Sequence, residues 1–167
     1  ILKRKPTGTL VLDALRSGKK LFLFATGTGI APFASLIRDP SAYEAFTEIV
    51  LVHTCRMRED LAFGKLILDL RQKDCLLKDL NIQKLKYFPT LTREKFVNEG
   101  RITDLISSGS FFRDIGISGF CADTDRAMVC GSLDFNKEMK TILLNAGFEE
   151  GSISNPGDFV LERAFAG

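Results

Sequence analysis

Residues 21–32, with the sequence LFLFATGTGIAP, join a short apolar run to a glycine-containing turn. Leu21–Ala25 is apolar at every position, which is typical of a strand buried on both faces of a parallel sheet. Gly27 and Gly29 follow this run and would let the backbone turn tightly and approach a pyrophosphate. Pro32 stands where the third glycine of a GxGxxG motif would be, and proline suits the first turn of a helix. The stretch predicts a strand, a phosphate-binding turn and a helix, although a tight turn without a ligand would show the same pattern.

The rest of the chain alternates short apolar runs with amphipathic stretches. Further apolar or mixed runs lie at Ile49–Val52, Leu85–Phe88 and Ala127–Val129. Amphipathic stretches, which predict helices, lie at Ile30–Arg38, Glu59–Gln72, Arg101–Ser107 and Phe135–Asn145. This alternation favours an α/β fold, a doubly wound, Rossmann-like parallel sheet of about five strands with helices on both faces. Ligands of such sheets bind beyond the carboxyl ends of the strands, so the residues that follow each run are the candidates for a site.

The composition is that of a globular protein with one domain. The chain has 167 residues, of which 45% are hydrophobic and 26% charged, and its net charge is +2. So mild a charge does not indicate a nucleic-acid-binding or membrane-binding surface. No apolar stretch reaches the roughly 18 residues of a membrane helix and no signal peptide is recognisable, so we expect a soluble, cytoplasmic protein. The four cysteines form no CxxC pair and His53 is the single histidine, so no metal site is expected.

Arginine and threonine follow two of the apolar runs. The second run ends in His53-Thr54-Cys55-Arg56, where an NAD-specific domain usually has an acidic residue for the ribose 2′-hydroxyl. Thr92 and Arg93 follow the third run, and Arg101 begins the next amphipathic stretch. Because the guanidinium fork matches phosphate geometry, these residues predict a site for the 2′-phosphate of NADP(H) rather than for NAD(H).

Three further residues need interpretation. Arg58 comes shortly after Arg56, and it is expected to pair with Glu59 or Asp60 in a solvated charge cluster. Cys130 follows the fourth run and is either a buried thiol or a contact to a cofactor. His53 lies within an apolar run and is expected to be a hydrogen-bonded core histidine.

Several of these motifs occur together in one known family. They are Ala25–Phe33 (ATGTGIAPF), the His53–Arg56 strand end, Leu91–Glu94 (LTRE), Gly100–Thr103 (GRIT), Met128–Ser132 (MVCGS) and the terminal Val160–Gly167 (VLERAFAG). In this order, over nearly the whole chain, they resemble the C-terminal NADP-binding half of bacterial-type ferredoxin/flavodoxin–NADP⁺ reductases. That family holds FAD in an N-terminal β-barrel with an Arg-x-Tyr-Ser-type motif, which this sequence lacks. The resemblance implies that residues 1–18 are the end of the barrel and the inter-domain link, that residues 19–167 are the NADP(H)-binding domain, and that the FAD-binding domain is missing from the chain.

The resemblance also implies a role for each motif. Thr26, Gly27, Thr28 and Gly29 would bind the pyrophosphate and nicotinamide end, and Arg56, Thr92, Arg93 and Arg101 the adenosine 2′-phosphate. Cys130 and Gly131 would flank the nicotinamide, Ala164 and Phe165 would cover the flavin, and the candidate catalytic residues are Cys130, Ala164 and Phe165. The implied reaction is hydride transfer between nicotinamide C4 and FAD N5, with ferredoxin or flavodoxin as the partner for single electrons. Without FAD the chain is expected to bind NADP(H) but not to turn over.

Two other functions have similar motifs. One is the nucleotide-binding domain of an NAD(P)H-dependent oxygenase reductase or a cytochrome b5 reductase-like flavoprotein, against which the Thr92–Glu94 and Ala164-Phe165 matches argue. The other is a stand-alone dinucleotide-binding or sensing module, against which the start of the chain at Ile1 argues. A comparison of 2′-phosphorylated with plain nucleotides would separate the first of these from the reductase.

Overall fold

The computed structural model describes residues 10–61, 64 and 84–164. Its centre is a five-stranded, all-parallel sheet with the strand order β3-β2-β1-β4-β5. The strands are β1 Lys20–Thr26, β2 Glu48–Cys55, β3 Leu85–Leu91, β4 Asp125–Gly131 and β5 Phe159–Arg163. The predicted doubly wound α/β fold is confirmed.

The order of the strands reverses beside β1, the middle strand of the sheet. On one side β1 pairs with β2, with Thr26 beside Thr54, and on the other side it pairs with β4, with Ala25 beside Cys130. From β1 the chain runs outward through β2 to β3, then returns to β4 and runs outward again to β5. This topological switch point is where open parallel sheets bind their ligands.

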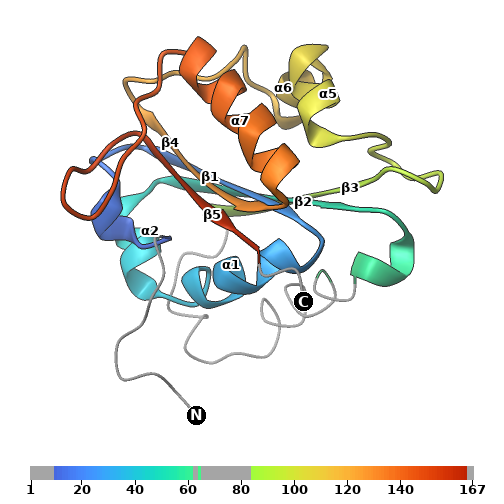
Figure 1. The fold of residues 1–167 in the computed structure, drawn as a ribbon, viewed down its shortest axis with the longest axis horizontal. Helices are drawn as coiled ribbons and strands as arrows, with labels where there is room; N and C mark the ends of the chain where they lie inside the picture. Colours follow the sequence, from blue (N-terminus) through green and yellow to red (C-terminus); the bar gives the residue numbers. More distant parts are fainter. Residues whose placement is uncertain (1–9, 62–63, 65–83, 165–167) are drawn as a thin grey trace.

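Helices cover both faces of the sheet (Figure 1). On one face lie α1 Ala31–Leu36 and α2 Pro40–Ala45, and on the other lie α5 Ile102–Ser107, α6 Ser110–Ile115 and α7 Leu133–Asn145. Alternate side chains of β1 enter two separate cores, as the period of a strand requires. Leu21 and Leu23 belong to the core on the α1 side, whereas Phe22 and Phe24 pack with Phe111 of α6 on the other side. Burial on both faces explains why β1 is apolar at consecutive positions.

Local signals place the helices that begin next to the carboxyl edge of the sheet. A short 3₁₀ helix, η2 Gly27–Ile30, leads from β1 into α1, and Pro32 lies in the first turn of α1. The Ser132 hydroxyl caps α7 by accepting a hydrogen bond from the Phe135 amide at 3.3 Å. These residues fix the starts of two helices beside the ends of β1 and β4.

The structure contains three elements that the periodicity of the sequence does not predict, namely α2, α6 and β5. Each of the two helices has six residues and lies outside the predicted amphipathic stretches, whereas α1 and α5, which are equally short, lie within them. In β5 only the first two residues are fully buried, so its apolar run is brief. The helix predicted at Glu59–Gln72 begins as the 3₁₀ helix η3 Arg58–Leu61, and most of its remainder lies outside the described residues.

Two kinds of feature are absent from the described part of the chain. None of its helices is both long and apolar enough to cross a membrane. Across residues 10–61, 64 and 84–164, no group of three or more histidine, cysteine, aspartate or glutamate residues is arranged to hold a metal ion.

Candidate functional site: a cavity at the switch point

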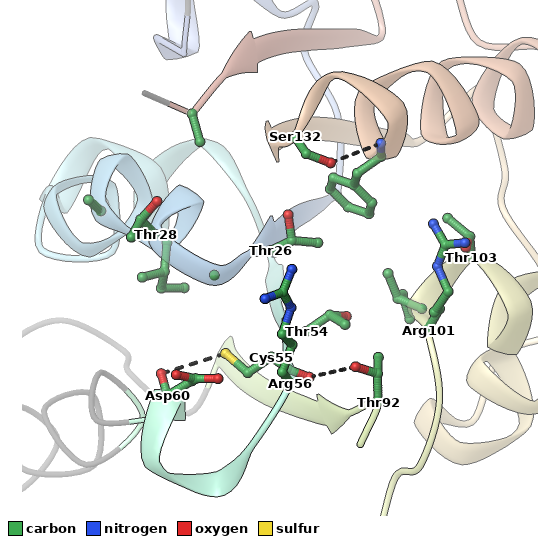
Figure 2. A pocket seen from close by; sticks show the side chains of 16 residues that line it. Thr26, Thr28, Thr54, Cys55, Arg56, Asp60, Thr92, Arg101, Thr103 and Ser132 are labelled. Carbon is green, nitrogen blue, oxygen red and sulfur yellow. Dashed lines mark hydrogen bonds between the residues drawn. The ribbon is translucent and has the colours of Figure 1, made fainter. Parts of the chain in front are cut away.

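A cavity of about 870 Å³ opens at the carboxyl ends of the strands (Figure 2). Residues that follow all five strands contribute to its wall: Thr26, Gly27, Thr28, Ile30, Ala31, Thr54, Cys55, Arg56, Asp60, Thr92, Arg101, Ile102, Thr103, Ser132, Phe135 and Ala164. Its volume lies within the ~300–1,000 Å³ that is typical of ligand sites. The place predicted from the sequence for a ligand is therefore a cavity of suitable size.

The turn after β1, Thr26–Gly29, is called the pocket turn below. Gly27 has a φ angle of +50°, and a Cβ atom built on it would meet nothing within 4 Å. Gly27 thus exposes backbone to the cavity in a conformation that favours glycine. Gly29 differs, because its Cβ atom would lie 2.2 Å from the carbonyl oxygen of Cys130. The structure accordingly explains Gly29 by close packing of the pocket turn on β4.

The ends of β2 and β3 remain paired beyond the last residues of the strands. The Thr92 amide donates to the Cys55 carbonyl at 3.0 Å, and the Arg93 amide donates to the Arg56 carbonyl at 3.0 Å. This pairing brings Arg56, Thr92 and Arg93 to one edge, as the sequence predicts. Arg56 and Thr92 line the cavity, whereas Arg93 lies next to Arg56 but is not part of the wall.

Arg56 is the cation that enters the cavity most directly. Its side chain points toward Thr26 in Figure 2, and the residue is exposed. Among the described residues, no hydrogen bond or ion pair engages the Arg56 guanidinium. Its donors are therefore available to an anionic ligand without the loss of an existing contact.

The expected partner of Arg58 is corrected by the structure. Instead of Glu59 or Asp60, the Arg58 side chain pairs with Glu94, at 3.1 Å between Nε and Oε1, and the Arg58 amide donates to the same carboxylate at 2.8 Å. Those contacts hold the pKa of the Glu94 carboxyl below its usual range. Arg58 and Glu94 are distant in sequence and meet because β2 and β3 are neighbouring strands. The spacing of residues along the chain does not contain this information.

Arg101 precedes α5 and lines the cavity from the opposite side. Its guanidinium pairs with both oxygens of Glu138 on α7, at 2.9 and 2.8 Å. Arg101 therefore lies where the sequence predicts, but with a carboxylate already bound.

A smaller cavity of about 320 Å³ lies between the pocket turn and β5. Its wall comprises Thr28, Gly29, Ala31, Pro32, Cys130, Glu162, Arg163 and Ala164. Cys130 is only 1% exposed, and burial raises the pKa of its thiol to about 11, with the charge of Glu162 acting in the same direction. The neutral thiol is thus both buried and adjacent to a cavity, so the two interpretations of Cys130 are compatible.

The remaining candidates lie around the same two cavities. Gly131 packs closely, since a Cβ atom on it would lie 2.3 Å from the Thr26 hydroxyl oxygen and 2.5 Å from the Phe135 ring. Ala164 lines both cavities, and its amide donates to the Gly131 carbonyl at 3.0 Å. Phe165 lies outside the described residues.

Several residues of the larger cavity have no role predicted from the sequence, although four of them lie within the quoted motifs: Thr54, Asp60, Ile102, Thr103, Ser132 and Phe135. Thr54 is the last residue but one of β2, and the others lie in the first residues of the helices at the same edge of the sheet or directly before them. Position after a strand was therefore the signal that could have found them.

Comparison with known proteins shows the family to which the chain belongs. Residues 23–141, from β1 into α7, match the oxidoreductase NAD-binding domain family. The chain belongs to this family.

Curated relatives of this NAD-binding domain are ferredoxin–NADP reductases. The chain is 52% identical over all its residues to the flavodoxin/ferredoxin–NADP reductase of Rhodobacter capsulatus and 43% identical to ferredoxin–NADP reductase A of Sorangium cellulosum. It covers 62% and 60% of those two proteins, so it spans about three fifths of their length. The resemblance inferred from the motifs is confirmed.

Solved structures agree with this assignment. The NAD-binding domain matches a Neisseria gonorrhoeae ferredoxin–NADP⁺ reductase with bound FAD and NADP at a TM-score of 0.81 and 25% identity, over 95% of this chain and 61% of the other. A flavohemoglobin from Malassezia yamatoensis matches at a TM-score of 0.64 and 21% identity, over 93% and 35%, which shows a shared fold alone.

Proposed function

We propose that the chain is the NADP(H)-binding domain of a flavin-dependent ferredoxin/flavodoxin–NADP⁺ reductase, in which bound nicotinamide and FAD exchange a hydride between C4 and N5. The relatives named above support this proposal through similarity over the whole chain. We propose further that residues 19–167 form the NADP(H)-binding domain, with FAD held outside them, and that ferredoxin or flavodoxin accepts or supplies the electrons.

The observation that carries the proposal is the position of Arg56. It stands at the end of β2, enters the larger cavity and has no ion-pair partner among the described residues. A carboxylate at this strand end would accept from the ribose 2′-hydroxyl of NAD(H), whereas an arginine suits a 2′-phosphate. Asp60 also lines the cavity, but its carboxylate accepts the Met57 amide at 3.1 Å. Arg56 in the wall and Arg93 next to it outnumber this carboxylate, so the charge at this end of the site favours NADP(H).

The residues present fit a dinucleotide from one cavity to the other. Arg56, with Arg93 and Arg101 nearby, would bind the adenosine 2′-phosphate, and the Thr92 hydroxyl would contribute a donor there. The open backbone of Gly27 leaves room for a pyrophosphate beside the pocket turn. Thr28 lines both cavities and would contact the ligand where it passes from one to the other.

In the smaller cavity the chain would orient the reacting end. The neutral Cys130 thiol presents no charge there. The hydrogen bond from the Ala164 amide to the Gly131 carbonyl places Ala164 at the cavity wall. We propose that four residues surround the nicotinamide and restrict its approach to the flavin, namely Cys130, Gly131, Ala164 and Phe165.

Calorimetry with 2′-phospho-AMP and AMP tests the proposal. We expect 2′-phospho-AMP to bind more tightly by about 10²-fold or more, because each charge-assisted hydrogen bond contributes ~1.5–3 kcal/mol. Arg56→Ala should remove a large part of this difference. Arg113→Ala is the matched control, since Arg113 is an exposed arginine on α6 paired with Asp114. Equal affinities for the two nucleotides would contradict the NADP(H) assignment and favour an NAD-linked reductase.

A second measurement addresses the flavin. The chain alone should not oxidise NADPH with ferricyanide, and supplying the FAD-binding part of the reductase should restore this activity. Turnover by the chain without flavin would contradict the proposal.

A further inference from the structure

Beneath the pocket turn, three polar side chains of β2 and β3 form a network in which His53 and Cys55 are buried and Tyr87 is half-buried. His53 is 1% exposed, and its Nε2 atom lies 2.9 Å from the carbonyl oxygen of Gly27. The Tyr87 hydroxyl lies 3.4 Å from Nδ1 of the same ring. Cys55 lies beside the ring, with Sγ 3.2 Å from Nε2, and its thiol donates to the Asp60 carbonyl at 3.6 Å.

The chemistry of these groups fixes the direction of each hydrogen bond. A carbonyl oxygen only accepts, so Nε2 must carry the ring proton that reaches Gly27, and Nδ1 must then accept from the Tyr87 hydroxyl. Burial lowers the pKa of His53 and raises that of Tyr87, so both groups are neutral, as this arrangement requires. The Gly27 carbonyl thus selects the tautomer of His53 that is protonated on Nε2, and the Tyr87 hydroxyl donates to the other ring nitrogen.

We propose that His53, with its Nε2 proton directed at Gly27 and its Nδ1 atom accepting from Tyr87, is a positioning residue that fixes the Gly27 carbonyl and thereby the pocket turn. This inference rests on the proposed binding of NADP(H) along the pocket turn. Gly27 has a positive φ angle and its own Cα has no neighbour on the cavity side, so packing there does not restrain it. The hydrogen bond from His53 of β2 restrains the Gly27 carbonyl instead. A turn that is already held in the conformation that receives the ligand loses less entropy when the ligand binds.

The tautomer can be measured directly, because the chain has a single histidine. In ¹⁵N-labelled protein, long-range ¹H–¹⁵N correlations should show a neutral ring with its proton on Nε2, and His53→Gln should assign the signals by removing them. Tyr87→Phe should leave the proton on Nε2, because the Gly27 carbonyl still needs a donor, but should shift the Nδ1 signal by removing the hydroxyl that donates to it. Tyr43→Phe is the matched control, since Tyr43 is the other tyrosine and its buried hydroxyl donates to the Ile37 carbonyl at 2.7 Å. A wild-type ring protonated on Nδ1 would overturn the proposal.

Nucleotide binding supplies the functional readout. His53→Leu should weaken NADP⁺ binding by about 10-fold, as expected for one lost hydrogen bond, but should weaken 2′-phospho-AMP binding less, because that ligand has only one of the two pyrophosphate phosphates and no nicotinamide to place along the pocket turn. His53→Gln should restore NADP⁺ affinity, since its amide nitrogen can replace Nε2. Equal NADP⁺ affinity of wild type and His53→Leu would overturn the role of His53. Absence of any NADP⁺ binding by the wild type would instead overturn the proposed function, and the inference with it.

Discussion

The guanidinium of Arg101 is bound to both carboxylate oxygens of Glu138, which joins the start of α5 to α7 at the wall of the larger cavity. Both side chains are partly exposed, at 52% and 39%. Exposed ion pairs stabilise proteins little, so this contact can open at low cost. A bound 2′-phosphate would compete with Glu138 for the same donors.

Glu138→Gln should therefore strengthen binding of 2′-phospho-AMP. We expect a gain of about 1.4- to fivefold at low ionic strength, which corresponds to the ~0.2–1 kcal/mol of an exposed ion pair, and the gain should shrink as salt increases. Glu150→Gln is the control, because Glu150 pairs with Lys140 away from the cavity and the change in net charge is identical. Unchanged or weaker binding after Glu138→Gln would show that Arg101 does not reach the phosphate.

The two arginines at the ends of β2 and β3 should differ in importance. Arg56 lines the cavity, whereas Arg93 is adjacent to it through the bond from its amide to the Arg56 carbonyl. Arg56→Ala should lower the preference for 2′-phospho-AMP over AMP more than Arg93→Ala does, each within the ~1.5–3 kcal/mol of a charge-assisted bond. Calorimetry with both nucleotides measures the ranking. Full discrimination by both variants would place the 2′-phosphate elsewhere.

The sequence predicts the central strands and the edge that carries the site, because consecutive apolar residues in β1, β2 and β4 report burial on both faces. It also predicts that Arg56 and Thr92 meet, since parallel strands end at the same edge. The Arg101–Glu138 and Arg58–Glu94 pairs depend on packing between elements distant in the chain, and local patterns do not contain that information. His53 is confirmed as a buried, hydrogen-bonded histidine, but its partners Gly27 and Tyr87 became evident only in three dimensions.

Gly27 and Gly29 should respond differently to alanine. Gly29→Ala would force a Cβ atom against the Cys130 carbonyl, so the free energy of unfolding should fall by ~1–3 kcal/mol or more, as in other overpacked sites. Gly27→Ala should cost about 1–2 kcal/mol for its positive φ angle and should also weaken NADP⁺ binding. Urea unfolding and calorimetry measure the two effects.

Gly116→Ala separates backbone strain from binding. Gly116 has a φ angle of +78° at the end of α6 and open space around its Cα, so its alanine variant carries a similar backbone cost away from the pocket turn. It should lower stability as Gly27→Ala does while NADP⁺ affinity stays at the wild-type value. Similar loss of affinity in both variants would mean that Gly27 acts only through stability.

The two buried thiols predict how stability changes in alkaline solution. Burial raises the pKa of Cys55 and of Cys130 to about 11 from the ordinary 9.0, so the folded protein keeps both protons at a pH where the unfolded chain begins to lose them. Because the unfolded state then binds fewer protons, the free energy of unfolding must fall as pH rises, from near pH 9 until the folded thiols also ionise near pH 11. At about pH 10 the expected loss of unfolding free energy is roughly 1 kcal/mol per thiol.

Urea unfolding of wild type, Cys55→Ala and Cys130→Ala at about pH 8 and about pH 10 measures this loss. Each variant should lose less stability between these two pH values than wild type does. Cys121→Ala, at an exposed cysteine, should behave as wild type. A wild-type stability that does not change over this interval would show that the thiols ionise as readily in the folded protein as in the unfolded chain.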